Sequence, residues 1–159
     1  MREILFRGKR LDNGEWVSSG NFIRFDPEEG KELVFIPAMH ERCVCAHDDN
    51  DNITAFETGM FYKVDLDTVG QYTGLKDKKG RKIFEGDIIK ENDVIHNGEL
   101  QYEGLFFAVV YANGCWFAIR NNRVGERKAM FLGGCCDVSE VIGNIHDNPE
   151  LLEGENTNG

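Results

Sequence analysis

Short runs of aromatic and β-branched residues, separated by Asn-Gly pairs, are the feature that most constrains the fold of this chain. The pairs lie at Asn13-Gly14, Asn97-Gly98 and Asn113-Gly114. Asn-Gly favours a type I′ turn because both residues tolerate a positive φ, and such a turn joins two antiparallel strands. The third pair separates Leu105–Tyr111 from Cys115–Arg120, and these two segments therefore predict a hairpin.

Other segments of similar composition predict further strands, whereas helix signals are scarce. The expected strands are Glu3–Gly8, Glu15–Ser19, Leu33–Ile36, Arg42–Ala46, Gly59–Val64, Val69–Tyr72, Lys82–Lys90, Ala129–Leu132 and Val138–Ile145. One short helix is expected at Asn148–Leu152, where Asn148 can cap the N-terminus and Pro149 suits the first helical position. With 18 Gly, 11 Phe and only 3 Pro, the chain is expected to be mainly β.

The expected organisation is two β regions that share 159 residues. Residues 1–74 form an N-terminal β region that does not fold independently and packs on the second region. Residues 75–152 are expected to form an SH3-like β-barrel region, by analogy of strand order alone, with Glu91–Glu103 as a polar loop and Asp77–Gly80 as a tight turn. Residues 153–159 are polar and predict a flexible tail.

Charge and cysteine content restrict the class of protein. The chain carries 18 Lys and Arg against 28 Asp and Glu, a net charge of −10, which disfavours binding of polyanions through the general field. No apolar run approaches the ~18 residues of a membrane span, and the first residues do not resemble a secretory signal. The five cysteines, with Cys135 and Cys136 adjacent, are therefore expected to be reduced thiols in a cytoplasmic protein.

A long central segment resembles a known family. The string VDLDTVGQYTGLKDKKGRKIFEGDIIK at Val64–Lys90 is similar to the signature of the YopX family of phage and prophage proteins. EILFRGKR near the start and VIGNIHDNPELL near the end resemble the two flanks of that family, so the resemblance frames residues 2–152. It implies a mainly β fold, a phage-related origin in a bacterial host cell and self-association. No activity is assigned to the family, and it supplies no catalytic residues.

Within the signature, the residue types themselves indicate turn chemistry. Gly74, Gly80 and Gly86 permit backbone angles that side chains disfavour. Asp77 and Asp87 can accept hydrogen bonds from nearby backbone amides, and Thr73 can do so more weakly. A folded hairpin and corner is the preferred interpretation, and a loop that presents Glu85 and Asp87 to a partner or ion is the alternative.

The segment around Cys43 contains the most suggestive metal ligands. Cys43, Cys45 and His47 would share one face of a strand, and thiolate and imidazole are zinc ligands. On an extended strand, however, the two cysteine Cα atoms would lie ~6.6 Å apart, which is wide for chelation. Buried reduced thiols are the preferred interpretation, so neither a metal nor a cofactor is expected.

The basic run at Lys76–Lys82 is the alternative functional site. Its cations are Lys76, Lys78, Lys79, Arg81 and Lys82. Small barrels that carry basic and aromatic residues often bind nucleic acids, but an exposed charged hairpin tip is the more ordinary explanation.

Neither a phosphate-binding glycine loop nor a nucleophile motif is present in the sequence. We therefore expect a non-enzymatic phage or prophage accessory protein that acts through protein contacts, chiefly as a homo-oligomer. A nucleic-acid-associated β-barrel module is the second hypothesis, and a metal-dependent enzyme without a sequence signature is the third.

Overall fold

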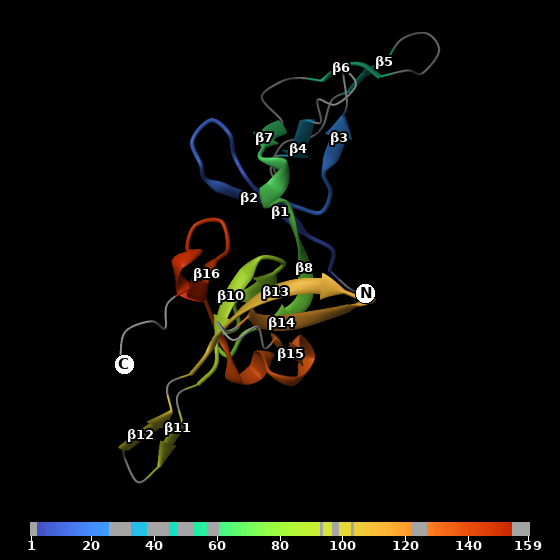
Figure 1. Ribbon diagram of the computed structural model, residues 1–159. Helices are drawn as coiled ribbons and strands as arrows, with labels where there is room; N and C mark the ends of the chain where they lie inside the picture. The colour runs from blue at the N-terminus through green and yellow to red at the C-terminus, as the bar shows by residue number, and fades with distance from the viewer. Residues whose placement is uncertain are drawn as a thin grey trace. The chain divides into compact units, whose positions relative to one another are not determined.

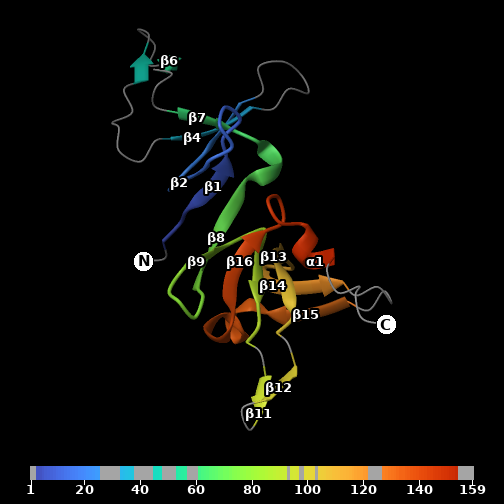
Figure 2. The same ribbon diagram turned by 90° about the vertical axis from the view of Figure 1, so that its left-hand side faces the viewer.

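The computed structural model describes residues 3–25, 33–37, 45–47, 53–56, 61–92, 94–96, 99–102, 104–121 and 127–153. The described residues are mostly β, with a few short helical turns, which confirms the expected fold class. It divides into two compact units, residues 1–71 and residues 72–159. Figures 1 and 2 show the elements of each unit.

Unit 1 is built from short antiparallel strands. They are β1 (Phe6–Lys9), β2 (Trp16–Ser19), β3 (Ile23–Phe25), β4 (Leu33–Pro37), β5 (Cys45–His47), β6 (Ile53–Phe56) and β7 (Phe61–Val64), followed by the 3₁₀ turn η1 (Leu66–Thr68). β4 pairs with β3 and β7, β1 pairs with β2, and β5 pairs with β6. Val34, Ile36 and Val64 form the buried core of this unit.

Strand β8 (Gly70–Lys76) contributes to both units. Its residue Gln71 pairs with Phe6 of β1 in unit 1. Its next residue, Tyr72, pairs with Phe84 of β9 (Lys82–Phe84) in unit 2. The division between the units therefore falls inside a hydrogen-bonded strand, between residues 71 and 72. That the N-terminal region packs on the C-terminal region stays a prediction.

Unit 2 contains the larger sheet. Its strands are β9, β10 (Asp87–Lys90), β11 (Val94–His96), β12 (Glu99–Tyr102), β13 (Phe106–Ala112), β14 (Cys115–Asn121), β15 (Arg127–Phe131) and β16 (Glu140–Asn144), with the 3₁₀ turns η2 (Leu132–Gly134) and η3 (Cys136–Val138) and the helix α1 (Glu150–Glu153). The order in the five-stranded sheet is β15-β14-β13-β10-β16, so β16, the last strand in sequence, pairs with β10, the first strand of this sheet in sequence. This sheet is a half-barrel, and its closure into an SH3-like barrel stays a prediction.

The core of unit 2 lies on one face of this sheet. Ile83, Ile89, Phe107, Val109 and Leu132 are fully buried there. In β13 the buried residues alternate with partly exposed ones, as the period of two along a strand requires. The half-barrel therefore has an inner face that packs on the core and an outer face.

Two of the three predicted turns fall on described residues. At Asn113-Gly114 both residues have positive φ, 50° and 80°, which confirms the predicted hairpin between β13 and β14. At Asn13-Gly14 only Gly14 has a positive φ, so the type I′ prediction is wrong there. The loop is longer than a two-residue turn: the amide of Arg10 donates to the carbonyl of Glu15, and this hydrogen bond encloses residues 11–14. Asn97-Gly98 lies outside the described residues.

Three predicted elements of unit 2 need correction. The single strand Lys82–Lys90 is interrupted at Glu85-Gly86, because Gly86 adopts φ 78° and the Asp87 carboxylate accepts the amide of Phe84 at 2.7 Å. The polar loop Glu91–Glu103 contains the paired strands β11 and β12. The strand Val138–Ile145 is shorter than predicted, since β16 covers only Glu140–Asn144 and Val138 belongs to η3. The short terminal helix is confirmed as α1.

Candidate functional site

Asp77 organises the turn between β8 and β9. Its carboxylate oxygen Oδ1 accepts the backbone amides of Lys79 and Arg81, both at 2.9 Å, and its carbonyl accepts the amide of Gly80 at 2.8 Å. Gly80 adopts φ 78°, which favours glycine. The interpretation of this part of the signature as turn chemistry is therefore confirmed.

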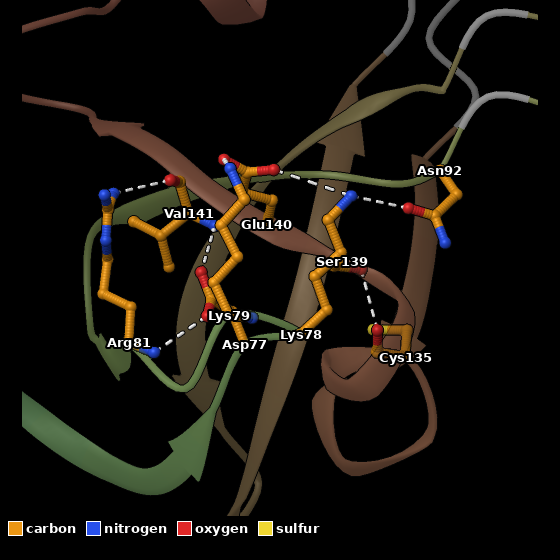
Figure 3. A network of polar contacts seen from close by, with 9 residues as sticks. All are labelled: Asp77, Lys78, Lys79, Arg81, Asn92, Cys135, Ser139, Glu140 and Val141. Atoms are coloured by element: carbon orange, nitrogen blue, oxygen red, sulfur yellow. Dashed lines mark hydrogen bonds and ion pairs between the residues drawn. The ribbon is translucent and has the colours of Figure 1, made fainter.

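The same turn closes one edge of the half-barrel (Figure 3). β16 is the last strand of the sheet, and the amide of Val141 donates to Asp77 Oδ2 at 3.0 Å. The Arg81 guanidinium donates to the carbonyl of Val141 at 2.7 Å, and the amide of Lys78 donates to the carbonyl of Ser139 at 3.0 Å. The side chains of Asp77 and Arg81 thus bond to the backbone amide and carbonyl of Val141 in β16, which a further strand would otherwise pair with.

Asp77 is 5% exposed, and its environment favours the ionised form. Burial opposes ionisation of the carboxylate, but hydrogen bonds from the amides of Val141, Arg81 and Lys79 outweigh burial and lower the pKa of Asp77. The nearby Arg81 guanidinium acts in the same direction. Asp77 is therefore a structural anion that holds the turn against β16.

The basic run predicted as an alternative nucleic-acid site makes contacts within unit 2. Lys78 and Lys79 both form ion pairs with Glu140, and hydrogen bonding to Lys79 lowers the pKa of Glu140. Lys78 also donates to the Asn92 side chain at 2.6 Å. Lys82 lies over the Tyr72 ring, with its Nζ 5.4 Å from the centroid.

Four of the five predicted cations thus have an intramolecular role: Lys78, Lys79, Arg81 and Lys82. Lys76 is exposed in β8. Ion pairs and hydrogen bonds of this kind offset part of the positive charge that a phosphate backbone would contact. The nucleic-acid interpretation stays a prediction, and the observed contacts do not favour it.

The metal hypothesis rests on residues that the structure describes only in part. Cys43 lies outside the described residues, and Cys45 and His47 belong to β5, where the structure describes the backbone alone. Among the residues with described side chains, no three or more His, Cys, Asp or Glu groups gather in a way that could hold a metal ion.

Cys135 and Cys136 are buried thiols beside the core of unit 2. The Sγ of Cys135 donates to the carbonyl of Leu132 at 3.6 Å, and that of Cys136 to the carbonyl of Gly133 at 4.0 Å. Burial raises the pKa of both thiols, and the charge of Asp137 raises that of Cys136 further. Burial therefore disfavours the thiolate form of both residues, and both pack in the core of unit 2.

The outer face of β13, β14 and β15 is apolar, a feature that the sequence analysis missed. Cross-strand pairing places Val110, Phe117 and Phe131 in one row and Ala108, Ile119 and Ala129 in the next. The rings of Phe117 and Phe131 lie 4.9 Å apart, and Phe131 is 64% exposed. We call the five residues Val110, Phe117, Ile119, Ala129 and Phe131 the outer face.

A signal for this face was present in the sequence. LFFAVVY and CWFAIR are apolar at both odd and even positions, a pattern typical of strands that are covered on both sides. The inner positions Val109 and Ala118 pack on the core of unit 2. The outer positions are only partly covered in the described part of the chain, which leaves apolar side chains exposed there.

Comparison with known proteins gives a family and similar solved structures. The family model for YopX protein matches residues 5–153. The crystal structure of protein EF1440 from Enterococcus faecalis is similar, with 25% sequence identity, a TM-score of 0.52, and coverage of 94% of this chain and 97% of that one. No curated protein matches the chain. None of the described helices has the length and apolar character needed to cross a membrane. The match over nearly the whole length shows that the chain belongs to the YopX family.

Proposed function

We propose that this YopX-family chain is a non-enzymatic accessory protein of phage or prophage origin that acts through protein contacts, chiefly with further copies of itself. Its place of action is the cytoplasm of the bacterial host. The observation that carries the proposal is the outer face, an uncharged and apolar surface on three adjacent strands.

The exposed area on this face favours association. A Phe side chain buries about 150–250 Å² when fully covered, so the 64% of Phe131 that is exposed corresponds to roughly 130 Å². Covering that area would contribute about 3 kcal/mol as an upper value. The ring of Phe117 and the side chain of Ile119 add partly exposed area in the same two rows.

Charge makes the mode of association testable. Copies that each carry a net charge of −10 repel one another at long range, and salt screens this repulsion. Contact through the uncharged outer face should therefore strengthen as salt rises. Binding of a polyanion to the basic run would instead weaken steeply with salt.

The experiment is native mass measurement at micromolar protein in volatile buffer, followed by sedimentation at low and high salt. We expect discrete multiples of 18.0 kDa that increase with salt, and their loss in Phe131→Ser. The matched control is Tyr111→Ser, which removes another exposed aromatic ring, 55% exposed, from the same five-stranded sheet but outside the outer face. A protein that is monomeric at both salt concentrations would refute the proposed self-association.

A further inference from the structure

The two edge strands of the five-stranded sheet, β16 and β15, differ in how their outward backbone groups are bonded. At the β16 edge, the Asp77 carboxylate and the Arg81 guanidinium occupy the amide and the carbonyl of Val141 (Figure 3). The amide of Lys78 occupies the carbonyl of Ser139 next to it. A strand that approached this edge would have to displace charge-assisted hydrogen bonds, each worth about 1.5–3 kcal/mol.

The β15 edge has the opposite character. β15 pairs with β14 through all five of its residues, and within the described part of the chain no strand pairs with its other side. An edge of this length presents a row of backbone donors and acceptors to a further strand. Ala129 and Phe131, both exposed, lie on this strand, so the open edge borders the outer face.

We propose that a second copy of the chain pairs with β15, antiparallel and about a two-fold axis, so that two five-stranded sheets join at this edge. The inference rests on the proposed self-association and names its site. Pairing at the β15 edge is more specific than contact through the outer face, because another molecule could cover the outer face without touching this edge.

The sequence of β15 suits pairing with itself. A two-fold axis at Ala129 sets residue 129 of one copy against residue 129 of the other, and Arg127 against Phe131. The cationic residues of the strand then face apolar residues rather than each other, which avoids like-charge pairs. Phe131 also gains a cross-strand neighbour on its second side, beyond Phe117 on β14.

The pairing predicts a specific cross-link. Directly opposed residues of antiparallel strands have Cα atoms about 4.5–5.5 Å apart, within the range that a disulfide spans. In a Cys115→Ser background, which removes an exposed thiol, Ala129→Cys should give a covalent dimer of twice 18.0 kDa under mild oxidation with oxidised glutathione. The matched control is Val138→Cys, 50% exposed and next to the closed β16 edge, which should remain uncross-linked.

A second pair of variants tests the same contact without oxidation. Ala129→Asp would bring two carboxylates together at the axis and should weaken self-association at least about tenfold, whereas Ala129→Thr, a good strand former, should preserve it. The β15 site would be overturned, and the proposed function left intact, by either of two results. In the first, oligomers persist in Ala129→Asp; in the second, the Ala129→Cys variant forms oligomers but no disulfide-linked dimer. A parent protein that is monomeric throughout would overturn both.

Discussion

Replacing Asp77 by Asn tests the account of the closed edge, because the change keeps the size of the side chain and removes its charge. The amides of Lys79 and Arg81 both donate to Oδ1, and an Asn side chain can still accept them. The amide of Val141 donates to Oδ2, which an NH₂ group would replace. In the variant, the side-chain NH₂ group and the amide of Val141, both hydrogen-bond donors, would therefore face each other at a buried position.

The magnitude follows from these contacts. Loss of a hydrogen bond to a charged acceptor costs about 1.5–3 kcal/mol, and a buried donor left without an acceptor costs about 1–3 kcal/mol. Val141 is buried, so water does not readily replace the lost acceptor. We expect Asp77→Asn to lower the free energy of unfolding of unit 2 by about 3 kcal/mol, a large share of the 5–15 kcal/mol typical of a domain.

The assay is urea unfolding followed by the fluorescence of Trp116, in a Trp16→Phe background so that unit 2 is observed alone. The folded-state pKa of Asp77 is lowered, so its ionised form stabilises the fold above the unfolded pKa of about 3.9. That contribution is lost as the pH falls through the folded-state pKa. The difference between parent and variant should be constant between about pH 5 and pH 7 and shrink below about pH 4.

The control is Asp137→Asn, which removes an exposed carboxylate from the same unit and should change the free energy of unfolding by at most about 0.5 kcal/mol. An effect of Asp77→Asn below about 1 kcal/mol, or equal to that of Asp137→Asn, would show that Asp77 does not hold the turn against β16. A difference that grows towards acid pH would contradict the sign of the pKa shift.

Three further predictions concern local packing and reactivity. Gly86→Ala should destabilise unit 2 by about 1–2 kcal/mol in the same urea assay, because Gly86 has φ 78° although space for a methyl group exists. Gly8→Ala should destabilise unit 1 by about 1–3 kcal/mol, since the new Cβ would lie 2.9 Å from Cγ2 of Val64. The fluorescence of Trp16 in a Trp116→Phe background would report the unfolding of unit 1, and an unchanged unfolding midpoint would contradict this prediction. Iodoacetamide at pH 8 should label exposed Cys115 well before Cys135, whose pKa burial raises, and peptide mapping by mass spectrometry would show the order.

Local signals allowed much of the fold to be predicted from the sequence. The hairpin at Asn113-Gly114 is encoded in two residues that both adopt positive φ, and its flanking runs form β13 and β14. The role of Asp77 follows equally from side-chain chemistry within four residues of chain. Such features are predictable because the partners lie close together in sequence.

Long-range features were not predictable in the same way. Asp77 accepts the amide of Val141, 64 residues away, and no spacing rule connects the two. The outer face was missed because the sequence shows that β13 and β14 are apolar on both sides but not which row packs on a core. The break at Glu85-Gly86 was missed because the apolar residues on either side suggest one continuous strand.

Strand β8 has a practical consequence for dissection of the protein. Gln71 and Tyr72 are neighbours in one strand, yet they pair with β1 and β9 respectively. A protease that needs an unfolded stretch of several residues finds no loop at this junction, so limited digestion should spare it while unit 1 and unit 2 are both folded. Truncation at residue 71 or 72 would cut a strand in two and deprive one of the resulting fragments of a hydrogen-bonded neighbour. Fragments meant to isolate either unit should therefore retain the whole of Gly70–Lys76.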